Sequence, residues 1–250
     1  LHLSYGIHGM VIASLMVETL MIFCRLYLSR NLVKFNFLTG VRIRKRLLKQ
    51  GMTFTLLGFV SMLAVKIDLL MISFLANPLE VGIYAVAYKL TGQLKMLRNT
   101  IAMSFLPMAV KKFDVESMQG SVLIKFSSYF AIFMLILAVL INFIIEDIIV
   151  TIFGSEFQES GKIFSVLIFY QVFAWAVLPF TTVLQATHNE AIALYVNCFC
   201  ALVNLTLNFL FYNRFGLIGI AYSTIVVYAA GLILMSFWTY IRMKNQGHLT

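Results

Sequence analysis

Three cations interrupt an apolar stretch between Gly82 and Pro107 that contains no Asp or Glu: Lys89, Lys95 and Arg98. On insertion scales a cation at the centre of a membrane helix costs about 2.5 to 3.5 kcal/mol, so three without a counter-charge cost on the order of 8 to 10 kcal/mol. An Arg guanidinium offers a planar fork for phosphate oxygens, and a Lys ammonium offers a point charge. The stretch therefore predicts a cationic, water-lined cavity that can hold an anionic group at membrane depth.

Not all of these cations lie on one side of the expected helix. A rotation of about 100° per residue places Thr91, Lys95 and Arg98 within about 60° of one another. Tyr84 extends this stripe, whereas Lys89 points elsewhere. The stripe is the predicted cavity surface.

Lys66 is the next cation expected to approach this stripe. The alternative for Lys95 and Arg98 is structural: they snorkel toward the membrane surface or pair with Glu18. Both readings remain open on the sequence alone.

Asp68 matches Lys89 in depth. Counting about 1.5 Å per residue from the Asn77-Pro78 turn puts both about 12 Å below the outer helix ends. We expect an Asp68–Lys89 ion pair, because pairing removes most of the insertion cost of both charges. The alternative is that Asp68 is the site of a coupling cation, H⁺ or Na⁺.

Side-chain amides form a second polar set. Asn197, Asn204 and Asn208 fall within about 40° on one helix face, and Gln171 lies on the preceding helix. They either line a cavity for sugar hydroxyls or hydrogen-bond to a neighbouring helix. We favour packing, because interhelical hydrogen bonds of about 0.6 kcal/mol are common in membrane bundles.

The sequence contains no motif of an enzyme or a metal site. The three cysteines form no CxxC pair, and there is no Walker A, GxGxxG, HExxH or GxSxG motif. We expect no enzyme activity, no metal site and no cofactor, apart from the possible coupling ion.

The composition indicates that the chain lies in a membrane. It is 61% hydrophobic and 12% charged, whereas about a quarter of the residues of a soluble domain are charged. We therefore predict an all-α integral membrane protein with about seven spans. The expected spans are 5–28, 52–76, 82–107, 122–146, 162–186, 190–212 and 216–241.

Charge placement predicts the orientation. Residues 29–50 carry seven Lys and Arg and no acid, so this loop should face the cytoplasm. Alternation then places the Asn77-Pro78 turn and the acidic segment 146–159 outside. The net charge of +9 is a topology signal and an attraction to anionic lipid, not a sign of nucleic-acid binding.

Residues 29–50 also form the expected domain boundary, with one helix before them and six in 51–250. The chain begins at Leu1 and starts outside by this orientation, so we expect the natural start to be missing. Pro179 should kink its helix, and Gly216 and Gly219 should allow a tight turn and close packing.

Three segments resemble a known family. They are Lys66-Ile-Asp68 with LLMISFLANPLEVGIYAVAYKL to Leu90, IFGSEF at 152–157, and NLTLNFLFYNRFGLIGIAYST ending at Thr224. Together they resemble the polysaccharide-transporter branch of the multidrug/oligosaccharidyl-lipid/polysaccharide exporter superfamily, which includes O-antigen flippases. The resemblance implies two six-helix lobes, with residues 1–28 as the last helix of the first lobe, 29–50 as the interlobe linker and 51–250 as the second lobe.

The resemblance also implies a function: transfer of a polyprenyl-pyrophosphate-linked glycan across the bacterial cytoplasmic membrane by alternating access, with the missing N-terminal lobe as partner. The pyrophosphate would bind at Lys95 and Arg98. Two alternatives stay open, a drug or cation antiporter of the same superfamily and an accessory membrane subunit that does not transport.

Overall fold

The computed structural model describes residues 6–30, 52, 66–115, 120–187 and 189–245. These ranges are helical and contain no strand, which confirms the all-α membrane class. The chain divides into two compact units, Leu1–Leu56 and Leu57–Thr250. The predicted linker 29–50 and the first half of the predicted span 52–76 fall almost wholly outside the described residues.

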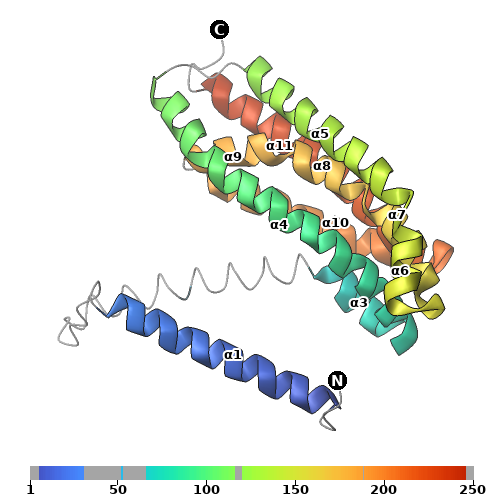
Figure 1. Ribbon diagram of the computed structural model, residues 1–250. Helices are drawn as coiled ribbons and strands as arrows, with labels where there is room; N and C mark the ends of the chain where they lie inside the picture. The colour runs from blue at the N-terminus through green and yellow to red at the C-terminus, as the bar shows by residue number, and fades with distance from the viewer. Residues whose placement is uncertain (1–5, 31–51, 53–65, 116–119, 188, 246–250) are drawn as a thin grey trace. The chain divides into compact units, whose positions relative to one another are not determined.

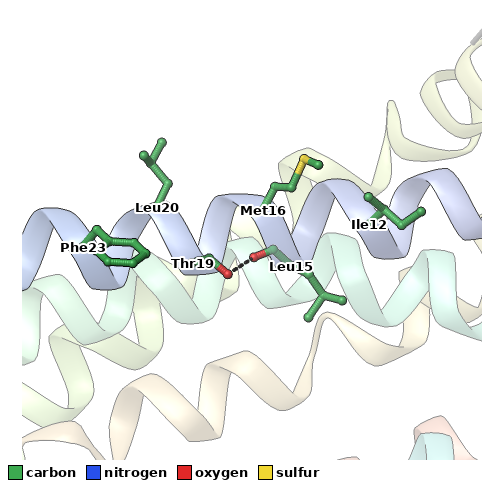
Figure 2. Close-up of a pocket in the computed structure, with 6 residues that line it drawn as sticks. All are labelled: Ile12, Leu15, Met16, Thr19, Leu20 and Phe23. Carbon is green, nitrogen blue, oxygen red and sulfur yellow. Dashed lines mark hydrogen bonds between the residues drawn. The ribbon is translucent and has the colours of Figure 1, made fainter.

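The first unit contains α1 (Gly6–Ser29), a 24-residue helix that is mostly apolar and carries Glu18 and Arg25 as its charged residues. Thr19 satisfies its hydroxyl within the helix by donating to the carbonyl oxygen of Leu15 at 2.7 Å. Figure 2 shows the apolar surface around this bond, formed by Ile12, Leu15, Met16, Thr19, Leu20 and Phe23. The predicted span 5–28 is thus a single helix long enough to cross a bilayer.

The second unit is a bundle of antiparallel helices (Figure 1). Its elements are α3 (Ile67–Leu75), α4 (Pro78–Val115), α5 (Gly120–Asn142), α6 (Ile145–Phe153), the 3₁₀ turn η1 (Ser155–Phe157), α7 (Gln158–Leu167), α8 (Tyr170–Ala176), α9 (Leu178–Ala186), α10 (Glu190–Phe215) and α11 (Leu217–Asn245). The pair α10 and α11 packs along its length, α4 packs on α7 and α9, and α5 packs on α8.

Five stretches of the described residues are long and apolar enough to cross a membrane: Val11–Ser29, Gly120–Asn142, Ser155–Ala186, Ala191–Phe215 and Leu217–Lys244. The predicted span 82–107 lies within α4, a continuous helix of 38 residues, but is not among the five. The reason is its charge content, because Lys89, Lys95 and Arg98 lower its hydropathy. Its length still allows it to cross a bilayer.

The helix ends follow the predicted alternation. The α3–α4 turn, the α6–α7 connection and the α10–α11 turn lie at one end of the second unit, and the C-terminal end of α11 lies at the other (Figure 1). The acids Glu146 and Glu156 are therefore at the end opposite Arg242 and Lys244. Which end faces the cytoplasm stays a prediction.

The turn between α3 and α4 is held by a capping box. The backbone N–H of Glu80 donates to Asn77 Oδ1 at 2.9 Å, and the N–H of Asn77 donates to Glu80 Oε2 at 3.3 Å. Pro78 occupies the first helical position, where its missing N–H removes no helical hydrogen bond. This short turn brings α3 alongside α4 and fixes the depth of the residues on both helices.

Glycine forms the α10–α11 hairpin as predicted. Gly216 ends α10 with φ of 64°, a conformation that favours glycine. A Cβ on Gly219 would lie 2.2 Å from the carbonyl oxygen of Phe211, so only glycine fits in the first turn of α11, where it packs against the end of α10.

The apolar stretch 155–186 is broken, and one break is the predicted proline kink. The helix is interrupted at Val177, two residues before Pro179, which has no N–H to donate to the preceding turn. Ser127 Oγ on α5 donates to the carbonyl oxygen of Ala176 at 2.8 Å. A neighbouring helix thus satisfies a backbone group at the kink.

Candidate functional site

Asp68 on α3 is buried, with 4% of its surface exposed, and its carboxylate accepts hydrogen bonds from two other helices. Its Oδ1 accepts from Asn204 Nδ2 and Asn208 Nδ2, both at 2.8 Å, on α10. Its Oδ2 lies 3.0 Å from Thr224 Oγ1 on α11. A buried carboxylate needs such donors, because an ion without them is strongly destabilised in a low-dielectric interior.

Contacts with α11 hold these donors in place. Ser223 Oγ is in hydrogen-bond contact with Asn208 Oδ1, and it lies 3.5 Å from Asn204 Oδ1. The hydroxyls of Ser223 and Thr224 each lie 2.8 Å from the carbonyl oxygen of Ile220, one turn earlier on α11. The amide planes of both asparagines are therefore oriented by α11.

The predicted Asp68–Lys89 ion pair is wrong. Lys89 is exposed, and the polar groups that act on Asp68 are the neutral side chains of Asn204, Asn208 and Thr224. Matched depth was not sufficient for pairing, because Lys89 lies on the outer side of α4. Among the described residues, the charge of Asp68 acts on the hydroxyls of Tyr84, Tyr88 and Tyr228.

The face of α4 that was predicted to carry the stripe is the inner face of the helix. Tyr84 and Thr91 are fully buried, Lys95 and Arg98 are half-buried, and Lys89 is exposed. Lys95 is half-buried and lies close enough to Arg98 for the two like charges to act on each other. Two adjacent like charges in a partly dry environment repel each other, and an anion between them would relieve this repulsion.

A polar aromatic layer lies beside these cations. Gln171 Nε2 on α8 donates to the carbonyl oxygen of Thr91 and to the hydroxyl of Tyr170, both at 2.9 Å. The Tyr170 ring contacts the ring of Tyr228 on α11, with centroids 4.7 Å apart. Arg98 lies within electrostatic range of both tyrosine hydroxyls.

The other side chains that the sequence singles out are either hydrogen-bonded within the bundle or exposed. Gln171, Asn204 and Asn208 are buried and hydrogen-bonded within the bundle, an arrangement that fits helix packing better than glycan contact. Asn197 is exposed. Lys66, just before α3, is also exposed and does not join the stripe in this structure.

Thr224, Ser223, Tyr170 and Tyr228 are the functional candidates that sequence reasoning missed. Thr224 is the last residue of the segment 204–224 that resembles the transporter family, and the contact of its hydroxyl with Asp68 was not predicted from the sequence. A signal was present, since Thr224 and Tyr228 are four residues apart on one helix face. What was missing was the neighbour that this face contacts.

Two groups of residues support different chemistry. The Asp68 cluster is Asp68 with Asn204, Asn208 and Thr224, and the α4 cluster is Lys95 with Arg98. The carboxylate of Asp68, enclosed by the amide NH₂ groups of Asn204 and Asn208 and the hydroxyl of Thr224, can take up a proton. In the α4 cluster, the planar guanidinium of Arg98 and the ammonium of Lys95 can both bind an anion. In the described part of the chain, no group of three His, Cys, Asp or Glu side chains could hold a metal ion.

Comparison with known proteins agrees with the membrane and glycan assignment at a coarse level. Residues 3–113 match a family described as polysaccharide biosynthesis protein. No curated protein and no solved structure matches the chain. The match covers α1, α3 and nearly all of α4 with its three cations. The resemblance to the polysaccharide exporter superfamily is thereby confirmed over residues 3–113.

Proposed function

We propose that this chain is part of a transporter that moves a polyprenyl-pyrophosphate-linked oligosaccharide across the bacterial cytoplasmic membrane by alternating access, with no covalent chemistry. The observation that carries the proposal is the half-buried pair Lys95 and Arg98 on the inner face of α4, two like charges close enough to act on each other. The match of residues 3–113 to a polysaccharide biosynthesis family supports the glycan as cargo.

The head group binds at this pair. Arg98 contributes two parallel donors to one phosphate, and Lys95, one turn earlier, contributes a point charge to the other. The polyprenyl tail stays in lipid while the glycan occupies water. Rocking of one lobe against the other then exposes the head group to the outer leaflet. In this proposal a second helical lobe supplies the opposite wall of the cavity.

Asp68 supplies the coupling site, and its geometry favours H⁺ over Na⁺. Asn204 and Asn208 present NH₂ groups to the carboxylate, whereas Na⁺ requires oxygen ligands. The hydroxyl of Thr224 has one proton but lies within hydrogen-bond distance of Asp68 Oδ2 and the Ile220 carbonyl oxygen. A proton on Asp68 satisfies both contacts, because the carboxyl donates to Thr224 and Thr224 donates to Ile220.

The same enclosure argues against the drug or cation antiporter. Such a transporter needs an acid that a cationic drug can reach. Asp68 is 4% exposed and its oxygens are occupied by protein donors. The cations Lys95 and Arg98 would repel the drug.

Complementation separates the candidate functions. The full-length protein is expressed in cells that lack their own flippase, and surface glycan is measured beside extrusion of a cationic dye. Restored glycan display without dye extrusion is the expected result. Dye extrusion without glycan display would establish the antiporter, and neither activity from a well-expressed protein would favour the accessory subunit.

A further inference from the structure

The two clusters are linked by one face of α11. Thr224 and Tyr228 lie one turn apart on this face. Thr224 contacts the carboxylate of Asp68 at 3.0 Å, and the ring of Tyr228 lies 4.7 Å from the ring of Tyr170. The hydroxyl of Tyr228 in turn lies within electrostatic range of Arg98. A displacement or rotation of α11 at Thr224 therefore moves Tyr228 relative to Arg98.

Tyr170, the partner of Tyr228 in this ring contact, is held in place by α4. Tyr170 accepts a hydrogen bond from Gln171, whose amide also donates to the backbone of α4 at Thr91. Gln171 and Thr91 are both fully buried. The Tyr170 ring is thus anchored to α4 one turn before Lys95, and Tyr228 on α11 is the partner that can shift against it.

We propose that the Tyr170–Tyr228 pair couples the charge state of Asp68 to the affinity of Lys95 and Arg98 for a pyrophosphate group. The proposal rests on the proposed function, because it regulates the same head-group site. Protonation of Asp68 changes Thr224 from the donor to the acceptor in their shared hydrogen bond. The altered contact repositions α11, and Tyr228 transmits the change to Arg98. The two tyrosines act as positioning residues.

A cycle of variants tests this coupling without requiring the identity of the glycan. The dissociation constant of inorganic pyrophosphate is measured calorimetrically on the full-length protein in lipid nanodiscs. Asp68→Asn represents the neutral carboxyl, and Tyr228→Phe keeps the ring contact while removing the hydroxyl near Arg98. Tyr222→Phe is the matched control, because Tyr222 is on the same helix but 40% exposed and packs on Phe215.

We expect Asp68→Asn to change the dissociation constant at least about fivefold in either direction. In the Tyr228→Phe background the same substitution should change it less than about twofold, and in the Tyr222→Phe background the full effect should remain. If Asp68→Asn does not fold, Thr224→Val replaces it, because it removes the hydroxyl contact and keeps the side-chain shape.

Two results contradict the proposal in different ways. Pyrophosphate binding that does not respond to Asp68→Asn or Thr224→Val, or a response that survives Tyr228→Phe, overturns the coupling and leaves the head-group site intact. Absence of pyrophosphate binding to the wild-type protein overturns the proposed function and the coupling with it.

Discussion

The side-chain amide of Asn208 on α10 donates to the carboxylate of Asp68 on α3 at 2.8 Å, across 140 residues of sequence. This bond joins α3 to α10 in a buried environment. It also orients the carboxylate toward Thr224. The stability of the bundle and the chemistry of the acid therefore depend on the same contact.

Replacement of Asn208 tests this contact. Asn208→Ala removes one donor from a buried carboxylate and leaves Ser223 without its amide partner, so we expect a loss of about 1 to 3 kcal/mol in unfolding free energy. A thermal melt in detergent measures it. Asn197→Ala is the control, because Asn197 is an exposed asparagine on the same helix. Equal melting temperatures for the two variants would contradict the structural role of Asn208.

Replacement by alanine should have opposite effects at Gly219, where α10 and α11 approach closely, and at Gly82 in α4. Gly219→Ala should destabilise the fold by about 1 to 3 kcal/mol, because its Cβ would meet the carbonyl oxygen of Phe211 at 2.2 Å. Gly82→Ala in α4 has open space around its Cβ and should be neutral or stabilising by up to about 1 kcal/mol. The measurement is the melting temperature, and an unchanged melting temperature for Gly219→Ala would contradict the hairpin geometry.

The hydroxyl of Ser127 should matter because it satisfies a backbone carbonyl at the Pro179 kink. Ser127→Ala leaves the Ala176 carbonyl oxygen without this donor inside the bundle, at an expected loss of about 1 to 3 kcal/mol. Ser128→Ala, at an exposed position beside it, serves as the control. Hydrogen exchange across 170–186 should rise in the first variant and stay unchanged in the second.

The sequence was sufficient for the helices and for the side of α4 that faces inward, because hydrophobic length and helical rotation are local properties. Pro179 and Gly216 were also readable, since each restricts its own backbone. The partner of Asp68 was not readable. The sequence gives the depth of a residue along its helix, but ion pairing also depends on how neighbouring helices are rotated about their axes. Lys89 is at the same depth as Asp68 but lies on the outer side of α4.

Orientation in the membrane is open to chemical labelling. In a protein lacking its native cysteines, single cysteines at Asn77 and Glu156 should react with an impermeant thiol reagent added from the periplasmic side. Cysteines at Arg44 and Lys112 should not react, because the basic loop 29–50 is predicted to be cytoplasmic. Labelling of Arg44→Cys from outside would reverse the assigned orientation.

The most direct test of the central claim is the flipping rate of lipid-linked oligosaccharide by full-length protein in proteoliposomes. Lys95→Ala with Arg98→Ala should lower the rate at least about tenfold at equal protein level, because both phosphate contacts are lost. Arg98→Lys should restore only part of it, since the charge remains without the bidentate fork. Lys89→Ala, which removes an exposed cation from the same helix, should leave the rate unchanged. A wild-type rate from the folded double variant would contradict a cationic head-group site on α4.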